Sequence, residues 1–193
     1  MKIRIALAFA AAATCLAAMS VMVRAAQDVG VQVESSRAMK LAIIDDGARG
    51  PMADQMHQAL SDSLAFEVSQ RCKSPVPIKH STPDAQKASF GLTNGVYDVV
   101  IVVGPKLPPT LVHSDCRILK ATPMSGDMKR VLWMIIRADD PGLTAMLEGA
   151  FPETLKETFF QKALARYSGK SGPDEIKSEW RVASMGGAAG GQP

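Results

Sequence analysis

Residues 94–104 read NGVYDVVIVVG, and this segment decides the fold. A turn-forming Asn-Gly pair opens it, and five consecutive β-branched residues at 99–103 precede Gly104. Because the run does not alternate polar with apolar residues, neither face of the predicted strand suits contact with water. Strands buried on both faces are typical of parallel sheets covered by helices. The segment therefore predicts a central strand of an α/β sheet.

The residues that follow this strand indicate where a ligand-binding site lies. In open α/β sheets, ligands bind beyond the carboxyl ends of the strands. Gly104, Pro105 and Lys106 follow the carboxyl end directly. We therefore expect a binding rim at this end of the sheet.

The segments before this strand alternate between strand-like and helix-like patterns. An apolar strand at 40–45 leads into a glycine-rich loop at 46–51, and apolar spacing then predicts a helix from 51 to about 70. A short strand at 76–80 contains a proline, which indicates an edge position, and a helix is predicted from 82 to about 93. This β-α-β-α-β order predicts right-handed crossovers between parallel strands.

The segments after the central strand predict a hairpin and two helices. Strands at 117–121 and 130–137 flank a Ser-Gly-Asp turn. Asp140, followed by a proline, has the pattern of a helix N-cap, and Pro152 is predicted to start a second helix. Charges at period two predict a half-buried strand at 176–182, with a short terminal helix as the alternative.

These elements predict an α/β fold: one three-layer domain at 39–183 whose mostly parallel sheet, of about five strands, is flanked by helices. Residues 1–25 have the charged start, apolar run and small-residue end of a signal peptide, so we expect export to the periplasm. An uncleaved anchor is the alternative, although the apolar run is short for a span of about 20 residues. Residues 26–38 are predicted to be a flexible leader, and 184–193 a disordered tail.

The charge balance excludes two classes of partner. The chain carries 22 basic and 19 acidic residues, and cleavage after Ala25 removes three basic residues and no acid, leaving 19 of each. The remaining sequence has no Lys/Arg cluster. We therefore expect no binding to nucleic acid or to an anionic membrane, and no membrane insertion after cleavage.

The cysteines are candidates for a disulfide, and the histidines are candidates for metal ligands. Cys72 and Cys116 remain after signal cleavage, and an even pair in an exported chain predicts a disulfide. Two buried free thiols are the alternative. His57, His80 and His113 show no ligand spacing to each other or to the cysteines, so we expect no metal.

The sequence offers no local catalytic motif. It lacks the Gly-x-Ser-x-Gly elbow, a C-x-x-C pair in the mature part, a Walker loop and a dinucleotide fingerprint. We therefore expect no enzymatic activity, no catalytic residue and no cofactor.

Three segments resemble the first lobe of periplasmic solute-binding proteins of the ABC-transporter family 3 type. Residues 40–46 look like the first strand and ligand loop of that family. Residues 92–101, LTNGVYDVVI, are similar to its L-x-x-G-x-x-D step into the third strand. Residues 130–143, with Asp-Asp-Pro between strand and helix, resemble its next strand-to-helix segment. The resemblance implies a periplasmic-binding-protein-like lobe and a role in solute binding or transport.

The chain departs from that family in two ways. Only residues 105–129 stand where the family inserts its second lobe. The Thr-x-x-Arg motif, whose arginine grips a ligand carboxylate, is replaced by GPKLPP at 104–109. We therefore expect a single open lobe and do not extend amino-acid specificity to it.

Four residues at the expected rim are candidate ligand-binding residues. Asp45 and Asp46 end the first strand, and their alternative role is to bond the loop backbone. Arg49 stands beside a predicted helix N-terminus, where anions bind, and its alternative role is that of a solvated surface residue. Lys106 follows the third strand and is the candidate point charge in place of the absent arginine.

The predicted function is that of an exported, non-enzymatic binding protein for a small solute or a partner protein at this rim. The alternative is an accessory subunit of a periplasmic redox or transport complex with no solute, because an open lobe exposes surface that partners cover.

Overall fold

The computed structural model describes residues 38–45, 50–124, 130–169 and 179–185. The signal peptide predicted at 1–25 and nearly all of the leader at 26–38 lie outside the described residues, as does the tail from 186 on. The described strands are β1 Met39–Asp45, β2 Ile78–Ser81, β3 Val99–Val103, β4 Cys116–Pro123, β5 Leu132–Arg137 and β6 Trp180–Met185. The helices are α2 Pro51–Cys72, α3 Ala85–Thr93, α4 Pro141–Thr154 and α5 Thr158–Tyr167, with a 3-10 turn, η1, at Pro109–Leu111.

The described strands form one six-stranded sheet in the order β2-β1-β3-β5-β4-β6. All five residues of β3 are buried, which confirms the interior strand predicted from the β-branched run. β2 lies at an edge, as predicted for the strand at 76–80, although Pro77 itself comes just before the observed strand. The prediction of a mostly parallel sheet is wrong. β1 is parallel to β2 and β3, whereas β5 is antiparallel to β3 and to β4, and β4 is antiparallel to β6.

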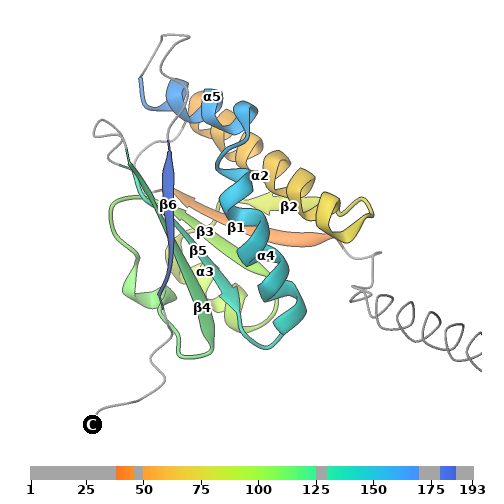
Figure 1. Ribbon diagram of the computed structural model, residues 1–193. Coiled ribbons are helices and arrows are strands. Elements are labelled where there is room, and N and C mark those ends of the chain that lie inside the picture. The colour runs from red at the N-terminus through yellow and green to blue at the C-terminus, as the bar shows by residue number, and fades with distance from the viewer. Residues whose placement is uncertain (1–37, 46–49, 125–129, 170–178, 186–193) are drawn as a thin grey trace, which may run out of the picture. The chain divides into compact units, whose positions relative to one another are not determined.

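Helices cover both faces of this mixed sheet, as Figure 1 shows. One core cluster joins alternate sheet residues to α2, α4 and α5, and its largest buried side chains include Phe151 and Phe160. A second cluster lies on the opposite face, where Ala88 and Leu92 of α3 and Leu111 of η1 pack against the sheet. The three-layer α/β prediction is thus confirmed, with α2 and α3 on opposite faces. No helix in the described part of the chain combines the length and apolarity needed to cross a bilayer.

Local signals explain several element boundaries. The Asp140 side chain accepts a hydrogen bond from the Leu143 backbone N–H at 2.8 Å, so the predicted N-cap is confirmed. Gly95, which follows the C-cap Asn94 of α3, has φ +70°, a conformation that glycine adopts without steric cost. The antiparallel pairing of β4 with β5 confirms the predicted hairpin.

Two boundaries in the C-terminal part differ from prediction. Pro152 lies inside the last turn of α4, and the next helix, α5, begins only at Thr158. This shift turns Phe160 into the core and leaves Phe159 58% exposed. β6 continues to Met185, so the first two residues of the predicted disordered tail are strand residues paired with β4.

The predicted disulfide between Cys72 and Cys116 is also wrong, because both thiols are free. Cys72 ends α2 and packs against the core on that face of the sheet, where its thiol donates to the Met146 sulfur at 3.1 Å. Cys116 belongs to the core on the opposite face. An even cysteine count carries no information about the face on which each residue lies.

Candidate functional site

A groove lies at the carboxyl ends of the two parallel strands β1 and β3. It is lined by the end of β1, the first two turns of α2, residues 82–85 and Lys87 at the start of α3, and residues 106–109 after β3. Its volume is about 1030 Å³. The chain leaves β1 toward α2 on one face and leaves β3 toward η1 on the other. This divergence is the topological switch point at which open α/β sheets bind ligands.

Asp45 is the polar centre of the site. It follows Leu41 and Ile43 on the sheet face that α2 covers, and its side chain is only 4% exposed. His57 Nε2 of α2 lies 3.2 Å from one carboxylate oxygen, and the Tyr167 hydroxyl of α5 donates to that same oxygen. Arg130 Nη1 lies 3.4 Å from the other oxygen. A buried carboxylate requires such partners, because an unpaired charge in the interior is strongly unfavourable.

Tyr167 and Arg130 form a second layer behind this carboxylate. Arg130 Nη1 donates to the Tyr167 hydroxyl at 2.7 Å, and its guanidinium lies 4.0 Å from the centroid of the Tyr167 ring. Burial, together with the hydrogen bond to Asp45 and the Asp45 charge, raises the pKa of Tyr167 to about 12. The phenol therefore stays neutral near pH 7 and keeps donating to Asp45.

His57 lines the groove and carries an unused polar atom. The residue is 4% exposed, and its Nδ1 has no hydrogen-bond partner among the described residues. A buried polar atom without a partner is destabilising by about 1–3 kcal/mol. Burial, and then repulsion from His57, lower the pKa of the neighbouring His80 on β2.

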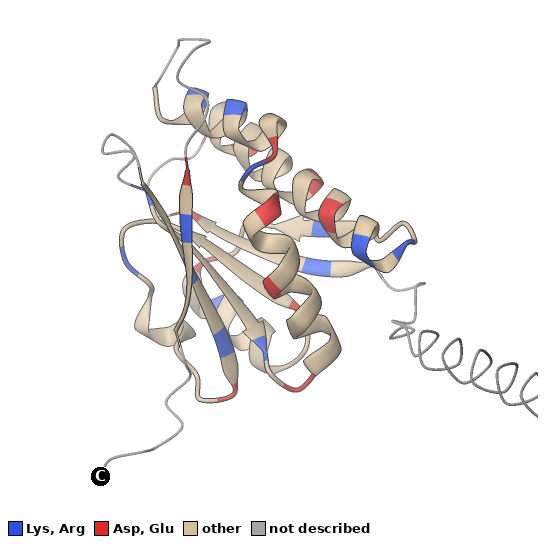
Figure 2. Ribbon diagram, viewed as in Figure 1, with Lys and Arg blue, Asp and Glu red and all other residues tan. Residues whose placement is uncertain are grey.

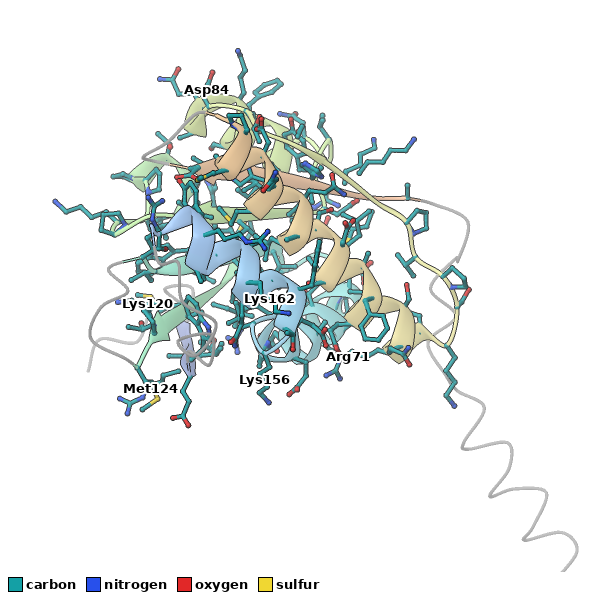
Figure 3. The ribbon with its side chains drawn as sticks, turned by 90° about the horizontal axis from the view of Figure 1, so that it is seen from above. Arg71, Asp84, Lys120, Met124, Lys156 and Lys162 are labelled. Carbon is teal, nitrogen blue, oxygen red and sulfur yellow. The ribbon has the colours of Figure 1, made fainter. Side chains whose placement is uncertain are left out.

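The charged side chains that line the groove differ in whether they form ion pairs with other described residues. Asp84 caps α3 by accepting from the Lys87 backbone N–H at 2.8 Å, and its carboxylate pairs with Lys87 Nζ at 3.3 Å. Lys106 is exposed and makes no ion pair with any described residue. The N-cap of α2, Gly50, provides no side-chain hydrogen bond. Figure 3 shows Asp84 near the end of the molecule where α2 begins, and Arg71 near the other end of that helix.

The structure brings two of the four predicted site residues to one groove. Asp45 and Lys106 both line it, although Asp45 is buried among protein partners and Lys106 is exposed. Asp46 and Arg49 lie outside the described residues. A ligand-binding role for any of the four stays a prediction.

Sequence reasoning missed His57, Arg130 and Tyr167. His57 had a detectable signal, because it precedes buried Leu60 and Leu64 by three and seven residues on the inner face of a predicted helix. The other two had none, because their contacts with Asp45 join residues 85 and 122 positions apart in the chain.

One serine–histidine pair deserves comparison with a catalytic dyad. Ser89 Oγ lies 3.0 Å from His113 Nε2 and donates to the Thr110 backbone oxygen at 2.6 Å. A hydroxyl has one proton, so Ser89 is the acceptor from His113 and is not an activated nucleophile. Within the described residues no group of three His, Cys, Asp or Glu side chains is arranged to hold a metal ion.

Comparisons with known proteins give little further information. No model of a known protein family matches the chain, and no curated protein matches its sequence. Among solved structures, full-length OxyR C199D from Pseudomonas aeruginosa is 9% identical, with 72% of this chain and 77% of that chain covered and a TM-score of 0.39. The resemblance to ABC-transporter family 3 proteins therefore stays a prediction from the sequence, and the chain is described by its own fold: an α/β domain with one mixed sheet.

Proposed function

We propose that this chain is an exported, non-enzymatic binding protein with a periplasmic-binding-protein-like lobe, which holds a small solute in the groove at the carboxyl ends of β1 and β3. The observation that carries the proposal is the groove itself, at the switch point of the sheet. Its volume of about 1030 Å³ is close to the range of roughly 300–1,000 Å³ in which small-molecule sites fall. Its lining combines apolar residues with a few polar groups, as such sites do.

A thermal-shift screen of the protein purified after export tests this proposal. A solute present at 100 times its Kd raises the free energy of unfolding by about 2.7 kcal/mol. Each kcal/mol of added stability raises the Tm of a domain of this size by roughly 2–4 °C. A specific solute is therefore expected to raise Tm by about 5–10 °C.

The variant Lys106→Ala is expected to reduce that shift, because Lys106 lines the groove and makes no ion pair with another described residue. The matched control is Lys162→Ala, which removes an exposed lysine from α5, visible in Figure 3 away from Asp84. The absence of any stabilising solute, or equal shifts in both variants, would count against the proposal.

A second candidate function is that of an accessory subunit that binds a partner protein. It is favoured by exposed apolar side chains on the side of the sheet that α3 and η1 cover. Phe90 is 71% exposed and Val112 56% exposed, and a hydrogen bond from Ser89 to Thr110 holds their two segments together. Pull-down from the native envelope with wild type and Phe90→Ser tests it, and a partner retained equally by both would contradict this surface.

A further inference from the structure

Strand β6 forms an edge of the sheet, and within the described chain it pairs with β4 and with no other strand. It ends the strand order β2-β1-β3-β5-β4-β6, and Figure 1 shows it running beside β4. Every residue from Ala183 to Met185 is exposed, so this part of the edge is open to solvent. A free edge presents a row of backbone N–H and C=O groups with which another strand can pair.

The hydrogen-bond pattern identifies the backbone groups of β6 that point away from β4. The Met124 N–H donates to the Glu179 oxygen at 2.8 Å, so these two residues are a hydrogen-bonded pair of the ladder. Such pairs alternate with non-hydrogen-bonded pairs along two antiparallel strands. In the observed register, residues 181, 183 and 185 therefore exchange hydrogen bonds with β4. The N–H and C=O groups of residues 180, 182 and 184 point outward.

The two edges of the described sheet differ in their protection against a further strand. β2 has only four residues, Pro77 comes just before it, and Pro83 follows two residues after its end. A short length and nearby prolines oppose the addition of a strand. β6 has six residues and contains neither proline nor glycine, and it is mostly uncharged in Figure 2. β6 is therefore the edge that can accept a strand.

We infer that β6 pairs with β6 of a second copy of this chain, antiparallel about a two-fold axis perpendicular to the sheet, so that the two sheets become continuous. This isologous pairing covers the β6 edges of both copies at once and leaves the protected β2 strands at the two outer edges. Pairing of β6 with β2 of another copy would instead propagate without closure, and the prolines beside β2 oppose it. A second copy thus fits this edge and ends the assembly at a dimer.

The side chains of β6 select the register of this pairing. With the two-fold axis at Val182, the two Val182 residues pair with each other, and Trp180 pairs with Ser184 of the second copy, so all outward groups are used. Arg181 then lies opposite Ala183, which is small and uncharged. An axis at Arg181 would place two guanidinium groups directly opposite each other, and like charges in that position are destabilising. An axis at Ala183 would leave Trp180 without a partner in β6.

This dimer leaves the groove accessible. The groove lies at the carboxyl ends of β1 and β3, whereas β5 and β4 separate β3 from β6. The inference therefore does not rest on the proposed function, and neither fails with the other.

Amide hydrogen exchange followed by NMR tests the inference on the protein purified after export. In a monomer, exchange alternates along β6: the amides of residues 181 and 183 are protected by β4, and those of residues 182 and 184 exchange fast. In the dimer, the amides of residues 182 and 184 are expected to be protected as well, and dilution is expected to remove that protection. Light scattering during size-exclusion chromatography should give a mass twice that of one chain at high protein concentration.

Variants at the edge separate β6 pairing from other modes of association. Ser184→Pro removes an outward N–H and leaves the bonds to β4, so it is expected to raise the dimer Kd at least about tenfold, because each dimer loses two hydrogen bonds. The matched control Ser184→Ala keeps the N–H and is expected to retain the wild-type Kd. Ala183→Glu places a carboxylate opposite Arg181 of the second copy and is expected to lower the Kd, whereas Ala183→Arg is expected to raise it.

Three results would overturn the inference. The first is a monomer at every protein concentration. The second is a dimer in which the amides of residues 182 and 184 still exchange fast, or whose Kd is the same in Ser184→Pro and Ser184→Ala. The third is a different protein that occupies β6 in place of a second copy.

Discussion

Replacement of Tyr167 by phenylalanine tests whether the network around Asp45 stabilises the fold. The change removes only the hydroxyl, which donates to the Asp45 carboxylate and accepts from Arg130 at 2.7 Å. The ring remains, with its packing and its contact with the Arg130 guanidinium at 4.0 Å. A hydrogen bond to a charged group contributes about 1.5–3 kcal/mol. We therefore expect Tyr167→Phe to lower the free energy of unfolding by about 1.5–3 kcal/mol.

The other tyrosine of the chain provides a matched control. The Tyr97 hydroxyl accepts from Ser81 Oγ at 3.1 Å in an exposed, uncharged pair, so Tyr97→Phe is expected to change stability by no more than about 0.5 kcal/mol. Urea unfolding followed by far-UV circular dichroism measures both variants. Equal effects of the two substitutions would refute the reasoning that the buried carboxylate depends on Tyr167.

Three further predictions follow from particular contacts. The pKa of Tyr167 is about 12 in the folded protein and ordinarily 10, so the stability that its phenol contributes is complete below pH 10 and is lost as the pH rises toward 12. Urea unfolding between pH 10 and pH 12 should therefore show a smaller loss of stability in Tyr167→Phe than in the wild type. An identical loss in both proteins would contradict this prediction. Both Cys72 and Cys116 should be alkylated when the protein is denatured without reductant, because both thiols are free. In the native protein Cys116 should react slowly, because burial raises the pKa of its thiol to about 11. A disulfide-linked peptide found by mass spectrometry would contradict this prediction. Gly91→Ala should destabilise the protein, because the added methyl overlaps the Tyr97 ring. Alanine ordinarily favours a helix over glycine by about 1 kcal/mol, so in a Tyr97→Ala background the same substitution should raise the free energy of unfolding.

Strong local patterns predicted the elements, whereas pairing depended on information that one sequence does not contain. The β-branched run at 99–103 was sufficient to predict a fully buried strand, and Asp140 before a proline predicted a helix start. The direction of β5 beside β3 was not predictable, because the order of elements along the chain does not determine which strands become neighbours. The error at Pro152 arose because proline is typical of the first turn of a helix, whereas Pro152 lies inside α4 and the next helix begins only at Thr158.

The site was predictable at its rim and not in its interior. Asp45 ends β1 and Lys106 follows β3, so the rule for open α/β sheets was sufficient to place them at one groove. The burial of Asp45 depends on Arg130 and Tyr167, which reach it from distant elements. A disulfide was inferred from the number of cysteines, whereas the strand register of Cys116 directs it to the face opposite Cys72.

The most direct test of the account is amide chemical-shift mapping with each solute that raises the Tm. The account predicts that the shifted amides lie at the carboxyl ends of β1 and β3, in the first two turns of α2 and at 82–87. Shifts confined to α4, to β6 or to the outer side of α3, or the absence of any solute that binds, would contradict it.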